Sequence, residues 1–275
     1  MSVRVAERVG EARPRRAKRP ELLRIVRPLG FLVGLLVVWQ LVTALGRVEA
    51  YLLPAPSLIV EAIWADLRSG ALLNNGGVTL YEAVLGFVLG SLAGFALGVL
   101  ISQSRALEDT IYPFIVALQA MPRVALAPLL IVWLGFGAES KVVIAALLAM
   151  FPLLVSVIVG LKSVEPERLE LMAALAASRW QTLWMVRLPG ALPVIFAGLE
   201  VGMVFSVVGA TVGELSGAKA GLMYLIQYRS FSMDTPGIFS ALVALSLMGL
   251  ALATLIRALG RRVVFWQARE NPAGV

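Results

Sequence analysis

The chain contains six long apolar stretches, and most of them carry no charged residue at all. They cover residues 29–46, 83–101, 111–134, 142–161, 188–213 and 235–256. A helix needs about 20 apolar residues to cross the hydrocarbon core of a bilayer, and one water-soluble core cannot hide six such surfaces. A composition of 59% hydrophobic and only 15% charged residues agrees with this interpretation. The sequence therefore predicts an all-α, polytopic membrane protein with about six transmembrane helices.

Two residue types are missing from the whole sequence, and their absence excludes several kinds of site. There is no cysteine, so disulfides, thiolate metal sites and cysteine nucleophiles cannot form. There is no histidine, which is the usual general base and zinc ligand. No Gly-Lys-Ser/Thr phosphate-binding loop occurs either. We therefore expect no cofactor, no metal site and no catalytic residues, and any ATP that drives this protein must be hydrolysed on a partner.

The segments around the apolar stretches divide the chain into regions. Residues 1–28 form a basic tail and 29–46 the first transmembrane helix; the alternative is a cleaved signal peptide that ends near Ala50. Residues 47–77 are expected to form an external linker, in which Ser57 caps an interfacial helix over 58–67 and a turn occupies 74–77. A membrane domain follows over 78–262, and residues 263–275 form a second tail.

The basic residues predict the orientation of these helices. With the N-terminus inside, the inner segments carry 18 Lys or Arg residues and the outer segments carry 5. Because Lys and Arg are enriched on the cytoplasmic side, both termini are expected in the cytoplasm. The same distribution accounts for the net charge of +7, since these residues lie near anionic lipid headgroups. Nucleic-acid binding is disfavoured, because no folded basic domain remains to carry it.

Polar residues inside the predicted spans are candidates for a solute pathway, because such residues usually face a cavity or a partner. Arg123 would suit an anionic solute; the equally weighted alternative is a structural role, with Glu200 as its ion-pair partner. A face of the fifth span is predicted to line the pore or, equally, to pack against other helices. The pathway candidates are Gln119, Arg123, Glu200, Ser206 and Glu214.

Four glycines recur at a spacing of four residues in the second span, and so lie on one face of a helix. Small residues in this arrangement let two helices approach closely in lipid. We therefore predict a helix-packing face; a sliding seam in alternating access is a minor addition. Its members are Gly86, Gly90, Gly94 and Gly98.

The segment 163–189 between the fourth and fifth spans is predicted to be a helical elbow on the cytoplasmic side. Pro166 suits the first turn of a helix, and Pro189 begins the next span. The small residues of the run 173–178 would let a partner backbone approach closely. The alternative is an amphipathic helix that rests on the membrane surface.

The elbow resembles the cytoplasmic loop of permease subunits of ABC importers. That loop has a Glu-Ala-Ala triplet, a Gly four residues later and an Ile-x-Leu-Pro ending. Glu170 takes the Glu position and 186–189 (Val-Arg-Leu-Pro) take the ending, while Leu171 and Met172 depart from Ala-Ala and Ala176 stands in place of the Gly. Further short motifs, in order, resemble the nitrate, sulfonate and taurine group and the branch of thiamine-precursor and riboflavin permeases; they lie at 53–57, 79–80, 127–129, 133–137, 151–152, 209–214 and 234–236.

The resemblance implies a function for the chain and for the elbow. It implies a permease in the bacterial inner membrane that imports a small, anionic or heteroaromatic solute by alternating access. It also implies a homodimer, two cytoplasmic ATP-binding subunits and an external solute-binding protein. In the family the elbow is a coupling helix that docks on the ATPase. The residues that correspond are Glu170, Ala173, Ala174, Ala176, Ala177, Ser178, Leu188 and Pro189.

Two other classes of protein have to be weighed against this one. A self-contained secondary carrier or channel is the main alternative, because six spans alone do not exclude it. A membrane-embedded enzyme has less support, since without His or Cys only Glu82, Glu200 and Arg123 are available near the membrane and their spacing suggests no site. The external segment 214–234 is the expected contact of a binding protein, with Lys219, Tyr224, Tyr228 and Arg229 as candidates.

Overall fold

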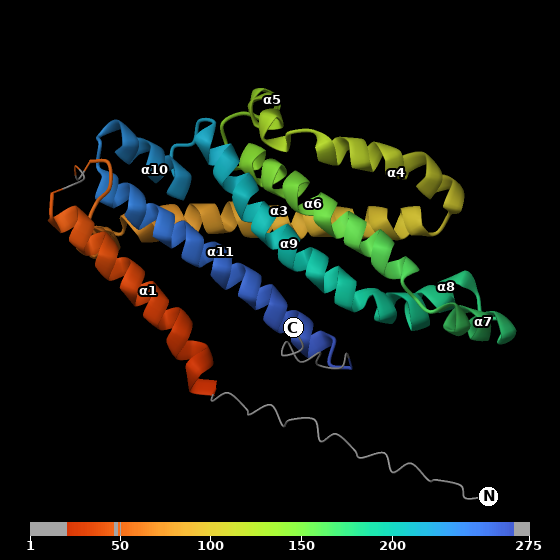
Figure 1. The fold of residues 1–275 in the computed structure, drawn as a ribbon. Coiled ribbons are helices and arrows are strands. Elements are labelled where there is room, and N and C mark those ends of the chain that lie inside the picture. Colours follow the sequence, from red (N-terminus) through yellow and green to blue (C-terminus); the bar gives the residue numbers. More distant parts are fainter. Residues whose placement is uncertain (1–20, 47–48, 50, 267–275) are drawn as a thin grey trace, which may run out of the picture.

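The computed structural model describes residues 21–46, 49 and 51–266, and within them it contains helices and connecting turns but no strand (Figure 1). The elements in chain order are α1 (Glu21–Ala44), α2 (Pro56–Ser69), α3 (Ala71–Ser102), α4 (Arg105–Ala120), the 3₁₀ turn η1 (Arg123–Leu126), α5 (Ala127–Leu134), α6 (Ala138–Lys162), α7 (Pro166–Ala174), α8 (Arg179–Thr182), the π-helical turn η2 (Leu183–Arg187), α9 (Leu188–Leu215), α10 (Leu222–Phe231) and α11 (Thr235–Val263).

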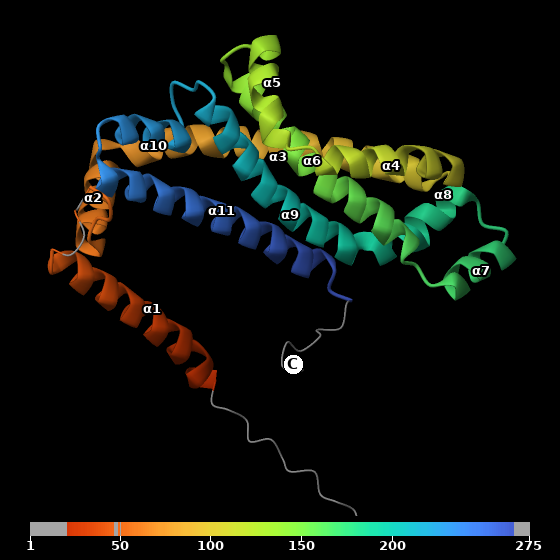
Figure 2. The same cartoon turned by 45° about the horizontal axis from the view of Figure 1, so that its top comes forward.

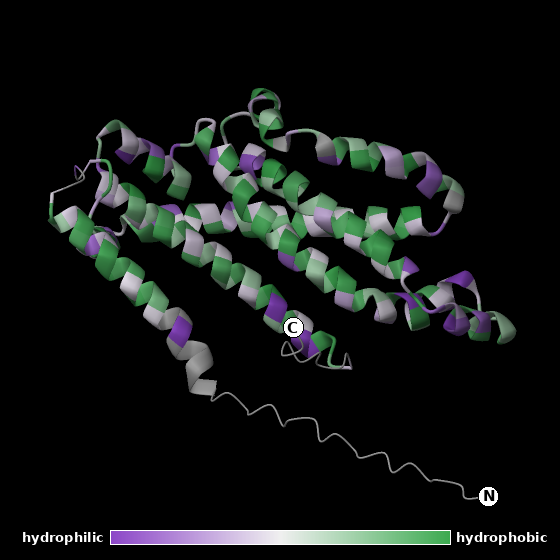
Figure 3. Ribbon diagram, in the orientation of Figure 1, coloured by the Kyte–Doolittle hydropathy of each residue, from purple (hydrophilic) through white to green (hydrophobic). Residues whose placement is uncertain are grey.

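The predicted all-α, polytopic class is confirmed. Among the described residues four helices are long and apolar enough to cross a membrane: α3, α6, the continuous segment 179–215 and α11. A fifth span is possible if α4 and α5 count as one, although they meet at 83° and α5 projects away from the bundle (Figure 2). The apolar part of α1, Gly30–Ala44, is shorter than these. Apolar residues cover most of the long helices (Figure 3). A count of six spans, and the orientation, remain predictions.

Helix α6 forms the centre of the bundle, and α3 and α9 pack on either side of it. Half of its most apolar 18-residue window is buried, against 17% for α11. Its residues Leu153, Val157 and Leu161 form one cluster with Leu183 of η2 and Ile195 of α9. The elbow end of the chain is thus joined to the core through Leu183, which is 3% exposed.

The glycine face of α3 lies directly against α6. A Cβ atom added at Gly86, Gly90 or Gly94 would overlap the main chain of α6 or the Ala145 side chain, and one at Gly98 would meet Val157. Helix α9 presents a second glycine row to the other side of α6, which the sequence analysis did not single out. Its members are Gly198, Gly202, Gly209 and Gly213. Both contacts therefore bring main chains close together without side chains between them.

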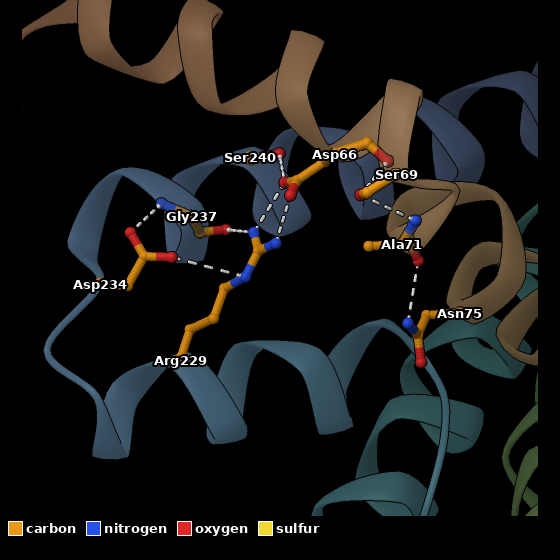
Figure 4. A network of polar contacts seen from close by, with 8 residues as sticks. All are labelled: Asp66, Ser69, Ala71, Asn75, Arg229, Asp234, Gly237 and Ser240. Carbon is orange, nitrogen blue, oxygen red and sulfur yellow. Dashed lines mark hydrogen bonds and ion pairs between the residues drawn. The ribbon is translucent and has the colours of Figure 1, made fainter.

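An ion-pair network joins α2, α10 and α11 (Figure 4). These helices meet at the end of the bundle opposite the elbow (Figure 2). Arg229 of α10 donates two hydrogen bonds to the Asp66 carboxylate of α2 and one, of 2.7 Å, to the carbonyl of Gly237. Ser240 of α11 donates to the same carboxylate at 2.5 Å. Asp66 is buried, although the amphipathic pattern of 58–67 placed it away from the apolar face. Arg229, a candidate binding-protein contact, is committed to this network.

The predicted turn at residues 74–77 is wrong, because all four residues lie inside α3. The amide of Asn75 donates to the Ala71 carbonyl, and its oxygen accepts a hydrogen bond of 2.9 Å from the main-chain N–H of Gly221. Leu72 packs against Leu222 and Leu225. These tertiary contacts outweigh the low helix propensity of Asn and Gly. The expected boundary between residues 77 and 78 therefore falls within a helix.

A helix is present where one was predicted, as α2, but its cap is not Ser57, and its place in the membrane interface stays a prediction. The helix begins at Pro56 without a side-chain cap, and the backbone N–H of Ser57 donates to the Gln40 side chain of α1 instead. The basic tail 1–28 overlaps the start of α1, and its first 20 residues lie outside the described part of the chain, as do 267–275 of the second tail.

Candidate functional site

The elbow occupies one end of the bundle, where α7 and α8 project beyond the ends of α6 and α9 (Figure 1). Pro166 stands at the start of α7, where its missing N–H costs no hydrogen bond. Helix α7 has no buried residue, so one whole side of it is available for a partner.

The turn after α7 depends on an unusual conformation at Ala176. Its φ angle is +52°, in the left-handed region that favours glycine. The N–H of Ala177 donates to the carbonyl of Met172 at 3.0 Å, across five residues, and this is the pattern of a Schellman motif. In such a motif the left-handed position is usually glycine. The geometry gives a physical reason for the glycine that importer permeases carry at the position of Ala176.

Replacing Ala176 by glycine is expected to stabilise the chain by about 1 kcal/mol, because an L side chain in the left-handed region costs ~1–2 kcal/mol and the gain in unfolded-state entropy offsets part of this. The midpoint of thermal unfolding in detergent measures the effect. Ala173→Gly, inside α7, is the matched control and should destabilise by about 0.5–1 kcal/mol. Equal destabilisation by both substitutions would contradict the left-handed turn.

A capping box begins the second arm of the elbow. The Ser178 hydroxyl accepts from the N–H of Gln181 at 3.2 Å, and the Gln181 side chain accepts from the N–H of Ser178 at 2.8 Å. The main-chain N–H groups of Ser178 and Gln181 at the start of α8 are therefore both satisfied within the turn. Ser178, a candidate coupling residue, thus has a structural role in fixing where α8 starts.

The candidate coupling residues fall into an exposed group and an anchored group. Glu170, Ala173, Ala174, Ala176 and Ser178 are exposed, and Ala177 is half-buried beside them. Leu188 and Pro189 are half-buried at the start of α9, and Leu188 packs against the core cluster of α6 and α9. The exposed group offers a small-residue surface. The anchored group ties that surface to the membrane helices.

The pathway candidates of the third predicted span lie on both sides of a break. Gln119 is exposed on α4, and Arg123 begins η1 after Pro122, while its side chain lies outside the described part of the structure. The break lies inside the third predicted span and separates α4 from α5, and the structure thus contains an interrupted helix next to Arg123.

Glu200 pairs with Arg257 of α11, so the suggested pair with Arg123 is wrong. The sixth predicted span, 235–256, ends one residue before Arg257. In the structure α11 continues to Val263, and this brings the guanidinium of Arg257 into contact with the Glu200 carboxylate of α9. The feature of the sequence that could have predicted this pair is an arginine that directly follows an apolar stretch.

Ser206 and Glu214 are fully buried within the chain, so they pack rather than line an open surface. The Ser206 hydroxyl donates to the carbonyl of Ala83 at 2.6 Å. The Glu214 carboxylate accepts from the Thr79 hydroxyl at 2.5 Å and from the N–H of Met223 at 2.7 Å. Ser206 and Glu214 thus take part in helix packing within this chain, and a pore-lining role for this face of the fifth span stays a prediction.

Glu214 belongs to a buried polar cluster that sequence reasoning missed. Glu82 of α3 is 2% exposed and Lys141 of α6 is 4% exposed, and the Lys141 ammonium donates to the carbonyls of Phe136 and Gly137 at 2.8 Å each. The helical spacing of Asn75, Thr79 and Glu82 was the available signal. It was hidden because Asn75 was assigned to a turn.

Comparison with known proteins identifies the class of membrane protein. A family model described as "Binding-protein-dependent transport system inner membrane component" matches residues 86–265, which include α4 to α11 and the elbow. The chain belongs to this family. It is therefore a multi-pass inner-membrane permease component of an ABC transport system, and the resemblance drawn from the elbow and the short motifs is confirmed.

Curated relatives cover nearly the whole permease. The riboflavin transport system permease protein RibX of Chloroflexus aurantiacus is 38% identical over 86% of this chain and 88% of its own length. The formylaminopyrimidine transport permease protein ThiX of Halalkalibacterium halodurans is 32% identical over 89% of this chain and 97% of its own. The taurine transport system permease protein TauC of Escherichia coli is 28% identical over 97% of this chain and 98% of its own.

A solved structure supports the fold of the permease. A chain of the MetNI methionine ABC transporter, solved in inward-facing conformations, aligns with a TM-score of 0.59 and 22% identity, over 79% of this chain and 99% of that chain. The two chains therefore share the same fold.

Proposed function

We propose that two copies of this chain form the membrane channel of an importer, and that two separate ATP-binding subunits drive it through the elbow. ATP hydrolysis is assigned to those subunits, and this chain contributes no catalytic group. The ATP-binding subunits bias the channel between outward-facing and inward-facing states, which requires that the elbow contact their two states differently.

The observation that supports this proposal is the way in which the elbow is folded and attached to the membrane helices. A surface of exposed alanines, 173, 174 and 176, is held by a Schellman turn and a capping box. Leu183, in η2, is packed in the core of α6 and α9. A force applied to the alanine surface therefore reaches the spans through packed side chains rather than through a loose loop.

The proposed solute is small and anionic or heteroaromatic. Relatives of this chain are named as permeases for riboflavin, formylaminopyrimidine, aliphatic sulfonates and taurine. We keep Gln119 and Arg123 as the pathway candidates, because they flank the break between α4 and α5. An external binding protein selects the solute, and α10 offers Tyr224 and Tyr228, whose rings stack at 6.2 Å, as its contact.

The proposal is tested by a charge on the alanine surface. We expect Ala174→Glu to abolish co-purification with the ATP-binding subunit and to reduce solute-stimulated ATP hydrolysis of the reconstituted complex at least tenfold, because a carboxylate would be desolvated in the docking site. Ala65→Glu, an identical change at an exposed position of α2, is the matched control and should leave assembly unchanged.

Intact assembly and stimulation in the Ala174→Glu variant would refute docking through the elbow. Gradient-driven flux from the purified chain, with no response to ATP or to the ATP-binding subunit, would instead establish the secondary carrier.

A further inference from the structure

A cavity of about 850 Å³ lies between the elbow and the ends of α3, α4 and α6. Its walls are largely polar. Gln103 and Glu108 line it from the turn between α3 and α4, Lys162 from the end of α6, and Arg179 and Arg187 from the elbow. Of the alanine surface proposed for docking, only Ala173 lines this cavity, together with the half-buried Ala177 beside that surface, so the cavity and the docking surface are largely separate parts of the elbow.

Two residues that line this cavity each contain a buried hydrogen-bond donor without a partner. The Nε atom of Arg187 and the amide nitrogen of Gln103 are both inaccessible, and neither has a hydrogen-bond partner among the described residues. A buried donor without an acceptor costs about 1–3 kcal/mol, and more when it is charged. Both atoms donate and neither can accept, so the missing group is an acceptor.

The charges of the residues that line the cavity also favour a negatively charged ligand. Glu108 is paired with Lys162, which leaves the guanidinium groups of Arg179 and Arg187 without an ion-pair partner in the described part of the chain. Two unpaired guanidiniums and an amide donor form a receptor for an oxyanion, because the planar fork of Arg matches phosphate oxygens in pairs.

We propose that this cavity binds a phosphate-bearing anion. The anion is either the headgroup of an acidic phospholipid or a soluble phosphate. Basic pockets between transmembrane helices on the cytoplasmic side are typical sites of lipid headgroups. The exposed Trp180 and Trp184, which meet edge to face at 5.6 Å beside Arg179, suit the bilayer interface. Placing the cavity on the cytoplasmic side rests on the proposed function of the elbow; the anion chemistry does not.

Bound in this position, the anion would connect the elbow to the turn between α3 and α4. Arg179 and Arg187 belong to the elbow, whereas Gln103 belongs to the turn after α3. An anion that contacts all three would hold the elbow against the ends of the spans. The ligand would thereby set how freely the elbow moves relative to the bundle.

The test measures binding to the purified full-length chain in neutral detergent, through the midpoint of thermal unfolding. The probes are inorganic phosphate, dioctanoyl phosphatidylglycerol and dioctanoyl phosphatidylcholine, with sodium chloride added to equal ionic strength. We expect a concentration-dependent rise in the midpoint with at least one phosphate-bearing anion and none with the zwitterionic lipid. Arg187→Gln should weaken the apparent affinity about tenfold or more, the cost of one charge-assisted hydrogen bond.

The controls make each outcome decisive. Arg168→Gln, an exposed arginine of α7 outside the cavity that is paired with Glu165, should respond like the wild type. If Arg187→Gln does not fold, the exposed Arg179→Gln replaces it with the same expectation. A response to phosphatidylglycerol alone assigns the site to lipid, and a response to phosphate assigns it to a soluble anion. No response to either anion, or an equal response in the cavity variant and the wild type, overturns the proposal. Neither result bears on ATPase docking, which Ala174→Glu tests separately.

Discussion

Replacement of Arg229 by methionine is expected to lower the free energy of unfolding by about 3–5 kcal/mol, the usual cost of removing one partner of a buried ion pair. The Arg229 and Asp66 side chains are 11% and 10% exposed, so little solvent would compensate the remaining carboxylate. The Asp66 carboxylate would keep only the hydroxyl of Ser240, and the carbonyl of Gly237 would lose the hydrogen bond from Arg229.

The same geometry keeps the arginine charged. The hydrogen bond to Asp66 raises the pKa of Arg229 above its usual value, against the opposite effect of burial. A raised pKa in a basic group means that the stabilisation is complete below the unfolded-state pKa and is lost only above it. The penalty of Arg229→Met should therefore not change between neutral and mildly alkaline pH.

Denaturation of purified protein in detergent, followed by circular dichroism, measures this effect. Arg168→Met is the matched control, because its pair with Glu165 is 63% and 65% exposed. Exposed pairs contribute only about 0–1 kcal/mol. The double variant Asp66→Leu/Arg229→Met should recover part of the loss, since it removes the unpaired charge. Equal, small effects of the two single substitutions would show that the network in Figure 4 does not hold α10 to α2.

Replacement of Gly90 by alanine is expected to destabilise the chain by about 3 kcal/mol, at the upper end of the range for overpacked cores. A Cβ atom at this position would overlap the carbonyl of Ala146 in α6. A main-chain carbonyl inside a helix cannot rotate away as a flexible side chain can, so α3 and α6 would have to separate.

Gly77→Ala provides a control in the same helix. No atom lies within 4 Å of the position of its added Cβ, and Gly77 is inside α3. There the substitution should be neutral or stabilise by about 0.5–1 kcal/mol, because alanine loses less entropy on forming a helix. The difference between the two variants in thermal unfolding isolates the α3–α6 contact. A Gly90→Ala variant as stable as Gly77→Ala would contradict that packing.

The sequence by itself determined the features that depend on composition and local chemistry. Apolar stretches of spanning length require lipid, whatever their neighbours are, and they predicted α3, α6, α9 and α11. Pro166 predicted the start of α7, because a proline without an N–H fits the first turn of a helix. The spacing of Gly86, Gly90, Gly94 and Gly98 predicted one face, because the helical period is fixed.

Only the tertiary structure decided the features that depend on distant partners. Residues 74–77 are helical because Asn75 and Leu72 contact α10 and the loop before it, and no local propensity reports such contacts. Glu200 pairs with Arg257 because α11 extends past the predicted end of the sixth span at Ile256 and passes beside α9. The left-handed angle of Ala176 is invisible in its residue type, since alanine favours a helix; the closing hydrogen bonds of the turn impose it.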